Sequence, residues 1–278
     1  MKVTALVDRF GSNRMNADKP AELLKGCTCI NVPFAGSLCE VAWFEANIIN
    51  VNDLDRHVMN LAAVVRDSRQ ELQAKLDATP FHPDVLAKAQ EYCRRRENDR
   101  QHIWEGMYFE WAYHYFVASW MTRGGKMGTK GEFDQGLSVR WKSGGGDSVV
   151  RFRSATESLA EWQKVMQRCT FHTLDAFDFL AECKKVVKGE PRDINANGIY
   201  CDAPWPQDGA RYTHRFPESM QRRLAKVLAE FEHTRIVVRY GDHPLIRELY
   251  PAPRWKWHPL TSRTQANEAK AEVLITNF

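Results

Sequence analysis

The sequence of 278 residues contains no apolar run long enough to cross a membrane as a helix. Residues 1–9 lack the extended apolar region of a secretory signal peptide. Internal repeats and low-complexity segments are absent as well, which excludes solenoid architectures. These absences predict a cytoplasmic globular protein, built as one large domain or as one domain that carries an insert.

Paired cysteine motifs are also missing. The sequence holds seven cysteines, but it has no Cys-x-x-Cys pair, and Cys27 and Cys29 stand too close together for the usual zinc spacing. An odd number of cysteines without paired spacing predicts reduced, mostly buried thiols, and we expect no metal site. The net charge of +4 permits a polyanionic partner without requiring one.

What the sequence does contain is an alternation of short apolar runs with helical segments. Strands are expected at residues 28–32, 48–51, 169–172, 198–201 and 235–240, with a closing pair at 254–258 and 271–277. Helices are expected at 17–24, 38–46, 154–168 and 244–250, and Pro217 is expected to open another. This alternation predicts an α/β fold with a doubly wound, mostly parallel sheet, formed by residues 1–66 and 154–278 and interrupted by an insert at 67–153.

Three of the expected strands end in an acidic residue, namely Asp53, Asp175 and Asp202. Ligands of open α/β sheets bind at the carboxyl ends of the strands, so we expect a site along this edge. Asp53 ends the second strand, where an acid can hold ribose hydroxyls. A helix N-cap is an equally good interpretation, since Asp53 or Asp55 could start the following helix.

The strongest chemical signal is Asp202-Ala203-Pro204-Trp205, directly after the strand at 198–201. This segment offers a carboxylate, a fixed backbone carbonyl and a flat aromatic surface, which together can hold a planar ring that bears an amine. A plain strand-to-loop turn is the alternative. The glycine-containing turn at 33–37 follows the first strand and is of the kind that places a ligand at a helix N-terminus.

The insert is basic and partly aromatic. Residues 67–103 are polar and helical, with an arginine cluster typical of a solvated helix face, and residues 104–120 are predicted to form a core helix. Alternation at 137–142 and 148–153, around a glycine-rich turn, predicts a β-hairpin with one basic face. A merely solvated hairpin is the alternative to a DNA-binding one. The candidates for phosphate contacts are Arg123, Lys126, Arg140, Lys142, Arg151 and Arg153.

Along nearly the whole chain, six segments resemble, in the same order, motifs of Dam-type DNA adenine-N6 methyltransferases, particularly phage and prophage members. The segments are 10–14, 33–37, 52–55, 174–179, 202–205 and 272–277. The resemblance implies a Rossmann-like methyltransferase fold with S-adenosylmethionine as the cofactor. It also implies double-stranded DNA as the partner and residues 67–153 as the target-recognition region.

The resemblance further implies roles for individual residues. Cofactor binding would fall to Phe10, Gly11, Asn13, Arg14, Pro33, Phe34, Gly36, Asp53, Asp175 and Phe177. The catalytic residues would be Asp202, Ala203, Pro204 and Trp205. Asp202 and the Ala203 carbonyl would accept the two amine hydrogens of an adenine flipped out of the duplex, and Trp205 would stack on that base.

Three residues depart from the family pattern. Leu38 stands at the second glycine of the cofactor loop, Asn13 at one register of a lysine, and Ala203 at the first proline of the catalytic motif. A non-catalytic DNA-binding protein on a methyltransferase scaffold is therefore an alternative. Transfer to cytosine N4 or to adenine in RNA also stays open, whereas cytosine-C5 chemistry lacks its usual Pro-Cys pair.

Overall fold

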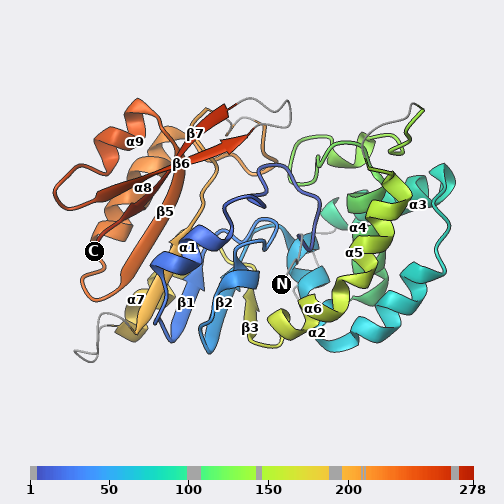
Figure 1. Ribbon diagram of the computed structural model, residues 1–278, viewed down its shortest axis with the longest axis horizontal. Helices are drawn as coiled ribbons and strands as arrows, with labels where there is room; N and C mark the ends of the chain where they lie inside the picture. Colours follow the sequence, from blue (N-terminus) through green and yellow to red (C-terminus); the bar gives the residue numbers. More distant parts are fainter. Residues whose placement is uncertain are drawn as a thin grey trace. The chain divides into compact units, whose positions relative to one another are not determined.

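A computed structural model describes residues 5–98, 108–141, 146–187, 196–207, 209, 211–263 and 269–278 (Figure 1). The chain divides into two compact units. The first comprises Met1–Ser12, Gly36–Ala42 and Asp55–Phe171, and the second comprises Asn13–Ala35, Trp43–Leu54 and His172–Phe278. The predicted insert, 67–153, lies within the first unit.

A seven-stranded sheet runs in the order β3-β2-β1-β4-β5-β7-β6. Its strands are β1 (Cys29–Val32), β2 (Ile48–Asn52), β3 (Cys169–His172), β4 (Asn197–Cys201), β5 (Arg235–Gly241), β6 (Lys256–Arg263) and β7 (Ala269–Thr276). The pairs β1–β2, β1–β4 and β4–β5 are parallel, whereas β7 is antiparallel to both β5 and β6. The prediction of an α/β fold with a mostly parallel sheet is confirmed.

β1 and β4 are neighbours at the centre of the sheet. From β1 the chain continues to β2 and β3 on one side, and from β4 it continues to β5 on the other side, so the strand order reverses between β1 and β4. This reversal is the topological switch point, outside which open α/β sheets bind their ligands. Pro33 follows β1 and Asp202 follows β4, so both residues lie at the carboxyl ends of the two strands that flank the switch point.

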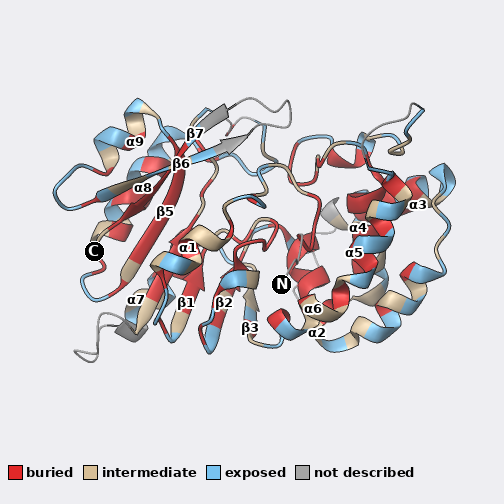
Figure 2. Ribbon diagram, viewed as in Figure 1, coloured by how far each residue is buried: buried red, intermediate tan, exposed pale blue. Residues whose placement is uncertain are grey.

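The helices of the second unit are α1 (Asp18–Leu23), α7 (Ala176–Val187), α8 (Glu218–Ala229) and α9 (Pro244–Leu249). Side chains from α7, α8 and α9 share one hydrophobic core with β4, β5 and β7. The central strands are almost continuously buried (Figure 2), as expected for parallel strands that are covered on both faces. On α8, which follows Pro217 as expected, one apolar face is formed by Leu224, Leu228 and the following Phe231, all buried, and by the half-buried Val227.

The first unit is helical. It contains α2 (Arg56–Asp77), α3 (Pro83–Asn98), α4 (Phe109–Met121), α5 (Ser148–Glu157), α6 (Leu159–Met166) and the 3-10 helix η2 (Glu132–Asp134). Tyr115, Phe116 and Trp120 of α4 are fully buried, which confirms the predicted aromatic core helix over the residues that are described. None of the helices in the described ranges is both long and apolar enough to cross a membrane.

The predicted β-hairpin is wrong. Ser148–Arg153 begins α5, where the Asp147 carboxylate caps the helix by accepting the Val149 N–H at 2.8 Å. The alternation of apolar and polar residues over six positions is too short to exclude a helix. In the helix, Ser148, Phe152 and Ala155 are buried, at the three- and four-residue spacing of one helix face. On the other side of the turn, Leu137 makes only an isolated bridge with Thr122, and Lys142 lies outside the described residues.

Two helix predictions also need correction. The expected helix at 38–46 is reduced to the 3-10 turn η1 (Val41–Trp43). Leu38, just before it, has a left-handed backbone with φ 64, which a right-handed helix cannot include. The expected single helix at 154–168 is divided between α5 and α6, which meet at Ser158.

Candidate functional site

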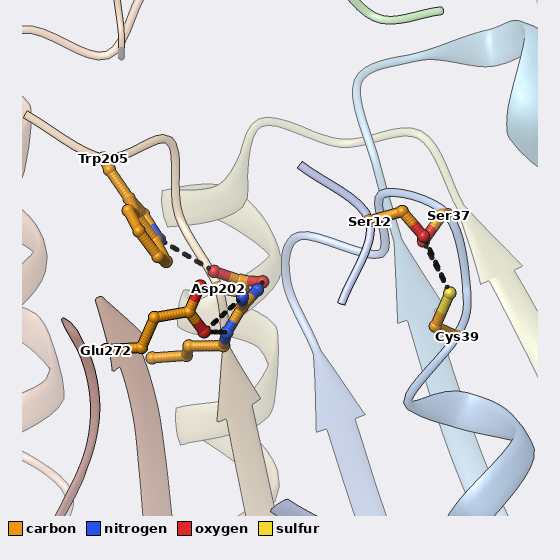
Figure 3. A network of polar contacts seen from close by, with 7 residues as sticks. Ser12, Ser37, Cys39, Asp202, Trp205 and Glu272 are labelled. Atoms are coloured by element: carbon orange, nitrogen blue, oxygen red, sulfur yellow. Dashed lines mark hydrogen bonds and ion pairs between the residues drawn. The ribbon is translucent and has the colours of Figure 1, made fainter. Parts of the chain in front are cut away.

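Asp202 lies directly after β4, and both of its carboxylate oxygens accept hydrogen bonds. Oδ2 accepts from Arg239 Nη1 at 2.7 Å, and Oδ1 accepts from Trp205 Nε1 at 3.2 Å (Figure 3). The Asp202 side chain is still 18% exposed, whereas that of Arg239 is only 5% exposed. Because a carboxylate has about four acceptor positions, Asp202 can still bind a further donor from the exposed side.

Glu272 of β7 holds the other side of the Arg239 guanidinium. Its Oε2 accepts from Nε at 3.1 Å and from Nη2 at 2.6 Å. In the β5–β7 pair, Glu272 lies opposite Gly241, so it is the diagonal neighbour of Arg239 on the same face of the sheet. The resulting cluster joins one cation to two carboxylates in a largely buried place.

The electrostatic surroundings of Asp202 act in opposite directions. Burial raises the pKa of the Asp202 carboxyl and so does the nearby Glu272, while Arg239 and the indole donor of Trp205 lower that pKa. Burial also raises the pKa of the neighbouring Cys201 thiol. A fully buried thiol of this kind is unreactive, in agreement with the prediction of a core cysteine.

Trp205 is buried beside the carboxylate, with 6% of its surface exposed. The Arg239 guanidinium lies 5.1 Å from the centre of the indole ring. A Cβ at Gly241 would come within 3.0 Å of two ring atoms of Trp205, so the absence of a side chain at this position accommodates the indole. Stacking of a base on Trp205 would require the ring to turn away from this packing.

A second pair of side chains holds the Ala203–Pro204 turn. Gln221 of α8 is fully buried, and its Nε2 donates to the Pro204 carbonyl at 2.6 Å. The Tyr240 hydroxyl of β5 donates to Gln221 Oε1 at 2.5 Å. None of Gln221, Arg239 and Glu272 was predicted from the sequence to belong to the site. The sequence feature that could have indicated them is a polar residue within an otherwise apolar strand or helix face.

Two of the predicted cofactor residues are brought together by an aromatic side chain that was not predicted. Phe216 makes an edge contact with Phe34, with ring centres 5.5 Å apart, and stacks on Phe177 at 6.3 Å. The Arg223 guanidinium lies 3.9 Å from the centre of the Phe177 ring. The aromatic group therefore joins the loop after β1, the start of α7 and the segment that precedes α8.

Asn52, at the end of β2, fastens the neighbouring loops. Its Nδ2 donates to the carbonyls of Pro33 and Leu174, both at 3.1 Å, and its Oδ1 accepts from the Leu174 N–H at 2.9 Å. The next residue, Asp53, is half-buried, and the N-cap of α2 is Asp55 rather than Asp53. Of the two acidic residues that could cap this helix, Asp55 is therefore the N-cap and Asp53 is not.

The other predicted cofactor residues are placed as follows. Asp175 accepts the Phe177 N–H at 2.9 Å at the start of α7. Asn13 is 4% exposed, and its Nδ2 has no hydrogen-bond partner among the described residues, while Arg14 is exposed. An amide donor that is buried without a partner is uncommon, and a ligand could satisfy it.

In the first unit, Ser12, Ser37 and Cys39 form a small polar cluster in which the three side chains are mutually 3.0 Å apart (Figure 3). Gly36 and Leu38, which flank Ser37, both have left-handed backbones, with φ 54 and 64. Leu38 stands where the resemblance expects a glycine, so this turn retains a glycine-like backbone despite the side chain. Phe10 and Gly11 belong to the adjacent N-terminal loop, where the Phe10 N–H donates to the Met127 carbonyl at 3.1 Å.

The basic residues predicted to bind DNA do not share one strand face, because the hairpin is absent. Arg123, Arg140 and Arg153 are exposed, and Lys126 is half-buried. Arg151 instead lies 3.1 Å from the buried carboxylate of Asp8. Its charge is therefore engaged within the first unit.

No protein-family model matches this sequence, and no curated protein matches it significantly. The described residues contain no cluster of three or more histidine, cysteine or acidic side chains that could hold a metal ion.

Proposed function

We propose that this protein is a DNA adenine-N6 methyltransferase that uses S-adenosylmethionine. The observation that carries the proposal is the Asp202 carboxylate, which follows β4 at the topological switch point and is held in place while still partly exposed. The sheet, in which helices flank parallel strands and an antiparallel pair closes one edge, is compatible with the fold that this activity requires.

The second unit contains side chains that suit the cofactor. Asn13 offers a buried amide donor that has no partner among the described residues, which fits a carboxylate such as that of the methionine end. Asp53, at the end of β2, suits ribose hydroxyls, and Phe34 and Phe177 offer aromatic surface for the adenine. Arg14, Pro33 and Asp175 belong to the same proposed set, while Phe10, Gly11 and Gly36 are in the first unit and stay predictions.

The bound cofactor would supply the methyl group on a sulfonium centre. The chain's own contribution is to orient the amine and to stabilise its charge. An aromatic amine is a weak nucleophile, because its lone pair is delocalised into the ring. If Asp202 accepts one amine hydrogen and the Ala203 carbonyl accepts the other, the nitrogen becomes pyramidal. The carboxylate then lies beside the positive charge that develops on nitrogen.

The test is single-turnover methylation of defined duplex DNA, with the modified base identified by mass spectrometry. We expect N6-methyladenine, and we expect Asp202→Asn to reduce the rate by roughly a hundred- to a thousandfold, because the acceptor loses its charge. Ala203→Pro should keep activity, since the backbone carbonyl stays. N4-methylcytosine as the product would refute the choice of base, and preference for an RNA substrate would refute the DNA assignment. A fully active Asp202→Ala protein would refute the mechanism.

The buried packing of Trp205 favours one alternative, a DNA-binding protein that does not catalyse transfer. The two functions differ in whether S-adenosylmethionine binds. Titration calorimetry with the wild-type protein and Asp53→Ala separates them. Binding that Asp53→Ala weakens supports the enzyme, and the absence of any heat with the wild-type protein supports the alternative.

A further inference from the structure

The guanidinium of Arg239 donates hydrogen bonds to two acidic side chains, Asp202 and Glu272. The three side chains differ in how far they are exposed to solvent. Glu272 and Arg239 are each 5% exposed, while Asp202 is 18% exposed. The series of hydrogen bonds thus starts in the buried part of the sheet and ends at the carboxylate of this cluster that a substrate could reach.

We propose that Arg239 and Glu272 are positioning residues for Asp202: Glu272 fixes the guanidinium of Arg239, and Arg239 fixes the Asp202 carboxylate. Glu272 Oε2 accepts from both Nε and Nη2, which restricts the orientation of the guanidinium. Nη1 then reaches Asp202 Oδ2, and Trp205 fixes the other oxygen. An acid or base that is itself oriented by a third group is a recurring feature of catalytic sites. The effect on catalysis depends on the proposed methyltransferase function.

Charge explains why Arg239 needs a second acid. A lone arginine beside Asp202 would neutralise the carboxylate and remove its attraction for a nitrogen that becomes positive. In the contacts described above, one cation lies between two acidic side chains, so the charge of Arg239 is shared between Asp202 and Glu272. Glu272 therefore preserves the electrostatic stabilisation of the transition state, while Arg239 preserves the geometry.

The sheet register explains why these three side chains meet. Cys201 pairs with Val238 in the parallel β4–β5 ladder, so Asp202 follows one step further, beside Arg239. Gly241 pairs with Glu272 in the antiparallel β5–β7 ladder. A parallel strand in place of β7 would have reversed the order of residues along this edge.

The test is direct titration of Asp202 by NMR in protein labelled with ¹³C at the aspartate carboxyl, with Asp202→Asn used to assign the signal. Among the described residues, the charged or titratable groups that interact with Asp202 are Arg239, Glu272, Cys201 and Tyr240. In Glu272→Gln a neighbouring negative charge is lost, so the pKa of Asp202 should fall. In the double variant Arg239→Met/Glu272→Met the stronger, directly bonded cation is also lost, so that pKa should rise.

The matched control is Arg222→Met/Glu248→Met, because Arg222 also lies between two carboxylates in the same unit, but on the surface. This control should leave the titration of Asp202 unchanged. If the double variant does not fold, Arg239→Lys takes its place, and weaker contacts from its single ammonium should again raise the pKa of Asp202. Identical titration of Asp202 in the wild type and in all of these variants would overturn the proposal.

Methylation kinetics give the second measurement. Glu272→Gln and the Arg239 variants should lower kcat at least tenfold while the affinity for S-adenosylmethionine stays within about twofold. The pKa of Asp202 could fall in Glu272→Gln and rise in the double variant while the wild-type protein transfers no methyl group. That result would refute the proposed function and support the positioning role. An active wild type with unchanged kcat in Glu272→Gln would support the function and refute the positioning role.

Discussion

Gln221 and Tyr240 form a fully buried pair that holds the backbone at Pro204: the Tyr240 hydroxyl donates to Gln221, and Gln221 donates to the Pro204 carbonyl. Both side chains are inaccessible to water, so hydration cannot replace the hydrogen bond between them when it is broken. This pair connects α8 and β5 to the turn that carries the proposed catalytic motif.

Replacing Gln221 should reveal this coupling. Gln221→Leu leaves the Tyr240 hydroxyl without its acceptor and the Pro204 carbonyl without its donor, and should reduce the free energy of unfolding by about 2–3 kcal/mol. In Gln221→Leu/Tyr240→Phe the orphaned hydroxyl is removed, so the double change should cost less than the sum of the two single changes. Urea denaturation measures each value, with the exposed Ser219→Ala as a control on α8. Strict additivity would contradict the pairing.

Gly241 should be sensitive even to alanine. The added methyl group would approach two ring atoms of Trp205 at 3.0 Å and Gln207 Nε2 at 2.5 Å, so the indole must shift. We expect Gly241→Ala to cost about 1–3 kcal/mol and to change the tryptophan emission, because Trp205 would separate from Asp202. Gly136→Ala is the control, since its Cβ would meet nothing within 4 Å. Equal behaviour of the two variants would refute close packing at Gly241.

At Leu38 a glycine variant should be more stable than an alanine variant, the reverse of the usual order. Its φ of 64 disfavours any residue with a Cβ, so Leu38→Gly removes strain that Leu38→Ala retains. Both variants lose the buried side chain, but the glycine variant should be more stable than the alanine variant by about 1 kcal/mol. At Leu228, inside α8, alanine should instead be more stable than glycine by about 1 kcal/mol. Thermal unfolding of the four variants tests this inversion, and the same order at both positions would contradict it.

His57 should make stability depend on pH. Its ring is fully buried, accepts from Trp111 Nε1 at 2.6 Å, and burial lowers its pKa to about 4. In the unfolded chain the pKa of His57 is higher, near 6.5, so between pH 4 and pH 6.5 the unfolded chain binds more protons than the folded protein. Stability is therefore complete above pH 6.5 and falls, by up to about 3 kcal/mol, as the pH drops towards 4.

The measurement for His57 is denaturant unfolding at several pH values between 4.5 and 7.5. His57→Gln keeps an acceptor but cannot titrate, so its pH dependence should be flatter than that of the wild type. The exposed His82→Gln is the control and should retain the wild-type slope. A wild-type slope in His57→Gln would show that another group is responsible.

Replacing Arg151 should affect the stability of the protein, whereas replacing the exposed arginines of the first unit should affect DNA binding. Arg151→Met leaves the Asp8 carboxylate without this ion pair and should cost about 2 kcal/mol of stability, between the values for exposed and buried pairs. Neutralising the exposed Arg123, Arg140 and Arg153 together should instead change stability by no more than about 1 kcal/mol, because interactions of exposed charges contribute little. It should flatten the salt dependence of DNA binding by roughly one unit of log–log slope for each phosphate that is no longer neutralised. If only Arg151→Met flattens that slope, the DNA surface involves Arg151 after all.

The central sheet was predictable because its strands are short apolar runs bounded by acids, prolines and glycines. Asp202 could be placed at a strand end for the same reason. The start of α5 was missed, because Val150 and Phe152 alternate with Arg151 and Arg153 over a stretch too short to distinguish a strand period from a helix period. The partners of Asp202 were missed for another reason. Arg239 and Glu272 are separated along the chain, and only the strand register brings them together.

The position of β7 has a consequence for the making of the protein. On the ribosome, Asp202 and Arg239 are synthesised before Glu272, which pairs with Arg239 only after β7 has emerged and inserted between β5 and β6. Until then the nascent chain cannot bury Arg239 with both of its carboxylate acceptors, so the site can be completed only late in synthesis.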